Sequence, residues 1–156
     1  QEPMVRHEAA EALGAIASPE AIQILEKHLK DSTIEVAETC ELALDRIKWL
    51  NSPESQTISL KSPYNSVDPA PPSILSDIEQ LEAILLDEKT ALFERYRAMF
   101  ALRNLNTKQS ILALGKGLKC GSALFKHEIA FVMGQIQNEQ SVEFLIESLE
   151  DCNENE

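Results

Sequence analysis

The sequence predicts an all-α protein, a solenoid of helical repeats, and three observations support this fold class. Apolar residues recur at the three- and four-residue spacing of a helix, and no segment alternates as a strand does. A segment near the start of the chain recurs near its end. Hydrophobic residues make up 44% of the chain and aromatic residues only 5%, which suits helices packed through aliphatic side chains.

The repeat is clearest between residues 5–16 and 125–136, which align at an offset of 120. Both segments contain a His-Glu pair, followed at the same spacings by Ala, Gly and Ile. Residues 36–47 and 95–105 share the apolar pattern without that pair. The first two copies are 31 residues apart, as are the last two, whereas 58 residues separate the second from the third. Two pairs of repeats joined by an insert explain these spacings.

Shorter amphipathic helices are expected between the four repeated ones. One follows Ser18 as its N-cap, with Pro19 at the first helical position. Another follows Ser76 as its N-cap, with Glu79 completing a capping box. The four apolar stripes are Ala21, Ile22, Leu25 and Leu29; Ile78, Leu81 and Leu85; Ile111, Leu114 and Leu118; and Val142, Leu145, Ile146 and Leu149. We expect about eight helices in two clusters of four, a HEAT-like solenoid of the bilin-lyase type.

The chain is expected to have four parts. Residues 1–50 and 73–150 each hold two HEAT-like repeats, and residues 151–156 form a polar tail. Residues 51–72 contain five of the seven prolines, so we expect a stiff, extended linker there.

Composition excludes several functions. The net charge is −12, which disfavours nucleic acid as a partner, because phosphate-binding surfaces need clustered Lys and Arg. A basic peptide or an amine substrate suits this charge, although solubility alone also explains it. No apolar run approaches membrane-spanning length, and no signal peptide is visible. Three cysteines without a CxxC motif indicate a reducing, cytoplasmic location. The chain has no starting Met and opens directly on a repeat motif, so we expect a fragment.

The two His-Glu pairs are the candidate metal ligands. His7 with Glu8 and His127 with Glu128 fall outside the apolar stripes of their helices. The stripe of the first helix contains Val5, Ala9, Ala12, Leu13 and Ile16, and that of the second contains Ala130, Met133 and Ile136. Equivalent helices of a solenoid stack side by side, so matching positions line one surface. Imidazole and carboxylate suit iron, manganese or zinc. A single pair is more often a solvated surface feature, and its recurrence favours a function.

Other catalytic motifs are absent. The HExxH motif of zinc proteases fails, because Glu11 and Phe131 stand where the second His is required. The chain has no Glu-x-x-His pair of a di-iron bundle, no phosphate-binding Gly-rich loop and no Gly-x-Ser-x-Gly elbow. His28 has no neighbouring Glu and is expected to be an ordinary surface residue.

Four segments together resemble the deoxyhypusine hydroxylase family, namely residues 2–16, 66–72, 92–104 and 120–128. The resemblance covers essentially the whole chain. It implies two facing halves of four repeats, with a di-iron (Fe2+) centre between them built from four His-Glu pairs. It also implies an O2-dependent monooxygenase that hydroxylates the deoxyhypusine side chain of eukaryotic translation initiation factor five A.

The resemblance also assigns roles to the two pairs. His7 and Glu8 would be the second pair of the N-terminal half, and His127 and Glu128 the first pair of the C-terminal half. His7, Glu8 and His127 would bind iron, whereas Glu128 would either bind iron or hold the substrate amine beside it. Residues 1–50 would be the last two repeats of the first half, and residues 73–150 the first two of the second half. With two of four pairs, we expect an incomplete site and no activity from this chain alone.

Two alternatives remain open at this point. One is a non-catalytic HEAT-repeat scaffold that binds a protein on its concave face, for which the recurring His-Glu pair would have no function. The other is a bilin-lyase-like HEAT protein, which explains neither the paired His and Glu nor the Ser-Val-Asp-Pro-Ala-Pro-Pro linker.

Overall fold

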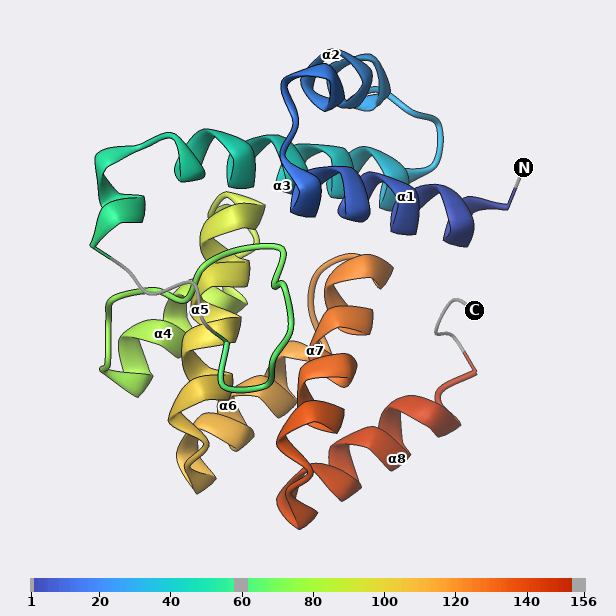
Figure 1. Ribbon diagram of the computed structural model, residues 1–156. Coiled ribbons are helices and arrows are strands. Elements are labelled where there is room, and N and C mark those ends of the chain that lie inside the picture. Colours follow the sequence, from blue (N-terminus) through green and yellow to red (C-terminus); the bar gives the residue numbers. More distant parts are fainter. Residues whose placement is uncertain (1, 58–61, 153–156) are drawn as a thin grey trace. The chain divides into compact units, whose positions relative to one another are not determined.

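The computed structural model describes residues 2–57 and 62–152, which form eight α-helices and two short 3-10 helices and no strand. The chain divides into two compact units, Gln1–Pro71 and Pro72–Glu156 (Figure 1). The helical fold class is confirmed. The expected clusters of four are wrong: three α-helices lie in the N-terminal unit and five in the C-terminal unit. The reason is that α4 (Ile78–Leu86), which follows the linker, packs on the two helices after it.

The N-terminal unit contains α1 (Pro3–Ile16), α2 (Pro19–His28) and α3 (Ile34–Leu50), followed by a 3-10 helix over Pro53–Gln56. The helices α1 and α3 lie side by side and run in the same direction, and α2 packs against both (Figure 1). The core of this unit consists of Ala10, Ala21, Leu25, Val36, Cys40, Ala43 and Ile47.

Small residues bring α1 and α3 together. A Cβ atom placed on Gly14 would lie 2.6 Å from Ala43 Cβ and 2.9 Å from Ala43 Cα, both closer than van der Waals contact. The two backbones therefore meet where neither helix carries a large side chain.

The buried face of α1 differs from the predicted one. His7, Ala10 and Gly14 are buried, whereas Val5 and Ile16, assigned to the buried stripe, are 67% and 70% exposed. Ala9 and Ala12 are exposed as well. Of the five residues of the predicted stripe, Leu13 alone packs against the core, because the close approach of α1 to α3 occurs at the small residue Gly14.

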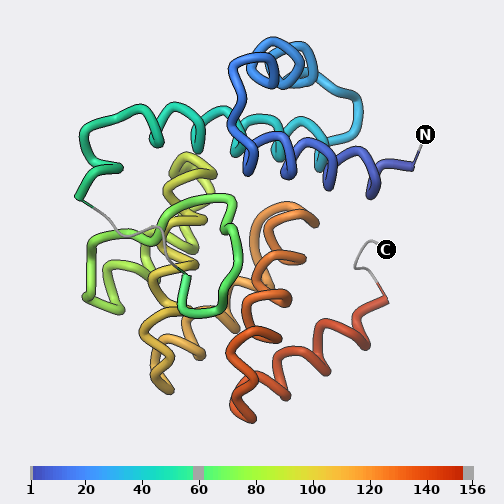
Figure 2. The backbone as a smooth tube through the Cα atoms, in the orientation of Figure 1, coloured from blue at the N-terminus to red at the C-terminus, as the bar shows by residue number. Residues whose placement is uncertain are grey.

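The C-terminal unit contains α4, α5 (Leu92–Leu105), α6 (Lys108–Gly117), α7 (Ala123–Ile136), a 3-10 helix over Glu139–Ser141 and α8 (Val142–Glu150). The helix α6 contacts α4, α5 and α7, so it lies in the middle of this unit, as the backbone trace shows (Figure 2). Its core includes Leu81, Leu85, Tyr96, Met99, Leu102, Ile111, Leu114, Ile129 and Val132.

Side-chain caps begin α4, α6 and α7, and one predicted cap needs correction. The N-cap of α4 is Asp77, whose carboxylate accepts a hydrogen bond from the backbone N–H of Gln80 at 2.8 Å. The predicted cap at Ser76 and the box with Glu79 are therefore wrong by one residue, because the Asp77 carboxylate satisfies the free N–H of the first turn. Ser18 is the N-cap of α2 as predicted, although its side chain makes no cap hydrogen bond.

Three of the repeated helices end in the same way. Ala17, Asn106 and Gln137 follow α1, α5 and α7 with φ of 56°, 46° and 53°. Each occupies the same place in the repeat, and each donates its N–H to the carbonyl four residues earlier. A left-handed residue after a helix is a common C-cap. The repeat seen in sequence is therefore repeated in backbone conformation. Of the described helices, none is long and apolar enough to cross a membrane.

Candidate metal centre

The first His-Glu pair lies in the first half of α1. The His7 imidazole is buried and the Glu8 carboxylate is exposed, with 3.7 Å between His7 Nε2 and Glu8 Oε1. Two ligands of one first-row metal ion lie at most about 4 Å apart, twice a metal–ligand distance of about 2.1 Å. The imidazole nitrogen and the carboxylate therefore fit a single ion.

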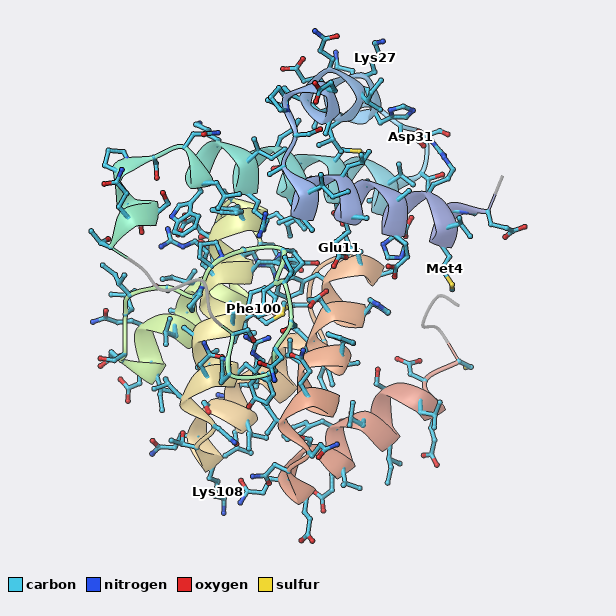
Figure 3. All side chains as sticks on the ribbon, viewed as in Figure 1. Met4, Glu11, Lys27, Asp31, Phe100 and Lys108 are labelled. Atoms are coloured by element: carbon cyan, nitrogen blue, oxygen red, sulfur yellow. The ribbon has the colours of Figure 1, made fainter. Side chains whose placement is uncertain are left out.

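Further negative charge surrounds this pair. Glu11 lies one turn after Glu8, on the side of α1 that faces away from α2 (Figure 3). Burial raises the pKa of Glu11, and the nearby carboxylates of Glu8 and Asp68 raise it further. Several carboxylates close together create a negative potential that attracts a cation.

The second pair, in the first turns of α7, has the opposite arrangement. His127 is exposed, whereas Glu128 is only 7% exposed. The expectation that both pairs lie outside the buried face is therefore wrong for His7 and for Glu128. The cause is the packing of each helix: α1 meets α3 through the Gly14 side, and α7 meets α5 and α6 through a different one.

A buried arginine holds the loop that precedes α7. Arg95 is 4% exposed, and its Nε donates to the carbonyl of Leu85 at 2.9 Å. Its Nη2 lies 3.6 Å from Cys120 Sγ, and its guanidinium carbon lies 3.9 Å from the centre of the Phe125 ring. These contacts join α5 to the start of α7 and so fix the position of the helix that carries the second pair.

The N-terminal unit contains the equivalent contact. Arg6 occupies the same repeat position as Arg95 and pairs with Asp31, 25 residues further on, as Cys120 is from Arg95. Asp31 also accepts from the N–H of Thr33 at 3.1 Å, and it lies in the loop before α3 (Figure 3). Hydrogen bonds from Arg6 and then from Thr33 lower the pKa of Asp31 to about 2. This pairing was not predicted from the sequence, and the shared spacing of 25 residues becomes evident only from the contacts themselves.

The structure places the four predicted ligands in two groups. His7 and Glu8 lie together in the N-terminal unit, and His127 and Glu128 are neighbours in the C-terminal unit. Over residues 2–57 and 62–152, no three His, Cys, Asp or Glu side chains are grouped so as to hold a metal ion. Each pair offers one imidazole and one carboxylate, and a dinuclear site needs more ligands than one pair supplies.

Comparison with known proteins first defines the class of the fold. Residues 1–45 match the HEAT repeats family, and residues 94–120 and 125–151 match the PBS lyase HEAT-like repeat. Together with the helical units described above, these matches make the chain a HEAT-repeat protein.

The relatives of the whole chain are more particular. It is 56% identical to a deoxyhypusine hydroxylase of Drosophila melanogaster over 100% of its length, and 55% identical to that of Danio rerio over 99%. A solved structure of human deoxyhypusine hydroxylase in complex with glycerol matches 99% of the chain, with a TM-score of 0.93 and 54% identity. The resemblance to deoxyhypusine hydroxylase is therefore confirmed. The chain spans about half the length of these relatives, 51% and 52% of the two hydroxylases and 53% of the solved chain.

Proposed function

We propose that this chain is part of a deoxyhypusine monooxygenase, which hydroxylates the deoxyhypusine side chain of eukaryotic translation initiation factor five A to hypusine. One observation carries the proposal: a His-Glu pair recurs at the same repeat position of α1 and α7, in a chain at least 54% identical to deoxyhypusine hydroxylases. A scaffold without catalytic function gives no reason for this recurrence.

The pairs are proposed to bind a di-iron centre. His7, Glu8 and His127 are the proposed iron ligands, and Glu128 either binds iron or holds the substrate amine beside it. The 3.7 Å between His7 Nε2 and Glu8 Oε1 fits a common ion. Bound iron would supply the activation of O2. We expect the remaining ligands to come from other parts of a longer protein, because the described residues contain no group of three or more His, Cys, Asp or Glu that could hold a metal ion.

The carboxylates beside the first pair are proposed to attract the substrate. Deoxyhypusine is a long cationic amine, and Glu8 and Glu11 place negative charge next to His7. The same excess of acidic residues, −12 over the chain, supports a substrate that is a cationic protein side chain and not a nucleic acid. The three free cysteines support a cytoplasmic protein.

Substitution of the histidines tests the metal ligands. In the longer protein, His7→Ala and His127→Ala should each lower the iron bound per chain and abolish hydroxylation, because each removes one imidazole ligand. His28→Ala is the matched control, since that imidazole contacts the carbonyl of Ile24 on the surface of α2. Unchanged iron content in both variants would refute the ligand role and favour the scaffold.

The 156-residue chain itself should not catalyse the reaction. One pair from each half leaves two incomplete sites, each too weak to hold iron. The measurement is iron per chain after loading with ferrous iron, together with an assay on deoxyhypusine-containing protein. Stoichiometric di-iron with turnover would show that two pairs suffice.

A further inference from the structure

A buried arginine in the N-terminal unit joins the linker to the helix that carries the first His-Glu pair. Arg46, on α3, is 8% exposed. Its Nη1 donates to the carbonyl of Gly14 at 2.9 Å, and its Nε donates to the carbonyl of Asp68 at 3.1 Å. The carbonyl of Gly14 lies in the last turn of α1, where carbonyls have no partner within their own helix. The Arg46 guanidinium therefore donates both to a carbonyl at the end of α1 and to a carbonyl of the linker.

The linker around Asp68 has its own hydrogen bonds. Ser66 Oγ donates to the Asp68 carboxylate at 2.7 Å and lies 3.0 Å from Ser62 Oγ. The Tyr64 N–H donates to Ser62 Oγ at 3.1 Å. This segment was predicted to be part of a stiff, extended linker, and these hydrogen bonds give residues 62–68 a defined local structure. Arg46 then attaches that structure to α1 and α3.

The attachment sets where the Asp68 carboxylate lies. Gly14 and Asp68 are bound by the same guanidinium, and Glu11 precedes Gly14 by three residues, which is one turn of the helix. Asp68 is thus held beside the acidic part of α1. The effect of Asp68 on the pKa of Glu11 supports the same placement.

We propose that Arg46 is a positioning residue that holds the linker so that Asp68 joins Glu8 and Glu11 in recognising a cationic side chain. The inference rests on the proposed function, and it extends the proposed substrate site to a segment that was predicted to be only a linker. Arg46 itself touches neither metal nor substrate. It acts through two backbone carbonyls, so the attachment does not depend on the Asp68 carboxylate.

This separation makes the two parts of the proposal independently testable. Asp68→Asn removes the charge and keeps the carbonyl that Arg46 binds. Arg46→Met removes the attachment and keeps the charge. Arg46→Lys retains a cation but not the forked geometry that reaches two carbonyls, and it is the variant to use if Arg46→Met does not fold. Glu26→Gln, on the exposed surface of α2, is the matched control for loss of one negative charge.

The first measurement is limited proteolysis of the 156-residue chain, which does not depend on enzymatic activity. Cleavage within residues 62–70 should be faster in Arg46→Met and Arg46→Lys than in the unmodified chain, and unchanged in Asp68→Asn. Equal cleavage rates in all variants would overturn the positioning role of Arg46, even if the hydroxylase activity is found.

The second measurement is hydroxylation by the longer protein. Asp68→Asn and the Arg46 variants should raise KM for the deoxyhypusine-containing protein about 1.4-fold to fivefold, the range of an exposed charge pair, with kcat little changed. The rise should shrink at high salt, because exposed charges are screened, and Glu26→Gln should leave KM unchanged. An unchanged KM in Asp68→Asn, in a protein that is active, would overturn the recognition role alone. A longer protein without activity would refute the proposed function, and the proteolysis would still decide the attachment.

Discussion

Replacing two equivalent glycines with alanine should have opposite effects on stability. Gly14 and Gly134 occupy the same position of the repeat. The new Cβ of Gly14→Ala would lie 2.6 Å from Ala43 Cβ and 2.9 Å from Ala43 Cα. Because one of these atoms belongs to the backbone, α3 must move away from α1 by about 1 Å to restore ordinary contact. Overpacking of this kind costs about 1–3 kcal/mol, and the better helix propensity of alanine returns about 1 kcal/mol.

The second glycine lacks this neighbour. Among the described residues, nothing lies within 4 Å of a Cβ atom placed on Gly134. Gly134→Ala should therefore stabilise the chain by about 0.5–1 kcal/mol from helix propensity alone. Each variant gains one methyl group at an equivalent repeat position. The difference between their free energies of unfolding therefore isolates the contact between α1 and α3.

Urea unfolding followed by circular dichroism measures both effects. Gly14→Ala should lower the free energy of unfolding by up to about 2 kcal/mol without a change in the urea dependence, and Gly134→Ala should raise it. Adding Ala43→Gly to Gly14→Ala removes the obstructing methyl group, so the double variant should be more stable than the sum of the two single effects. If Gly14→Ala stabilised the chain as much as Gly134→Ala does, the close packing of α1 on α3 would be refuted.

The remaining predictions concern charges. Cys120→Asp should reproduce beside Arg95 the ion pair that Arg6 forms with Asp31. It should raise the free energy of unfolding by about 1 kcal/mol, because a carboxylate accepts hydrogen bonds from a guanidinium far better than a thiol does. A lower free energy of unfolding than in the unmodified chain would show that burying the carboxylate costs more than the ion pair contributes. The folded-state pKa of Asp31, about 2, lies below its usual 3.8, so its contribution to stability is complete above pH about 4 and is lost as pH falls toward 2. The urea midpoint of Asp31→Asn should therefore fall less steeply over that pH range than the midpoint of the unmodified chain. An equal pH dependence of the two midpoints would contradict the pairing of Asp31 with Arg6. Binding of the substrate protein to the longer enzyme should weaken with rising ionic strength, and salt-independent binding would exclude electrostatic attraction.

Apolar periodicity and the internal repeat were sufficient to predict the helical repeats, because both can be seen in the sequence alone. The left-handed residue that ends α1, α5 and α7 recurs at one repeat position, but it is Ala17, Asn106 or Gln137, so self-alignment of the sequence did not predict it. The contact of Arg46 with Asp68 spans 22 residues, and the contact of Arg95 with Cys120 spans 25. Periodicity contains no information about which carbonyl or thiol a long side chain reaches, so these contacts required the structure.

The failure to predict the buried face of α1 has a specific cause. Five apolar residues suggested a stripe, but a helix can also pack through small residues, and Gly14 against Ala43 allows the closer approach. Besides the predicted apolar stripe, α1 has a face of small residues that includes Gly14, and the partner helix decides which face is buried. The same ambiguity decides the environment of His7, which lies on the small-residue face.

The two His-Glu pairs show that equivalence in sequence does not require equivalence in environment. The side chains of successive helix residues point about 100° apart. If a helix packs on its neighbours through a face rotated by that angle, the other residue of an adjacent pair becomes the buried one. This is the relation between α1, with His7 buried, and α7, with Glu128 buried. A buried carboxylate has fewer directions in which to move than an exposed one, and its charge must be compensated by whatever lies nearby. Glu8 and Glu128 therefore differ in their surroundings, and this difference supports the separate role that the family resemblance implies for Glu128, either binding iron or holding the substrate amine beside it.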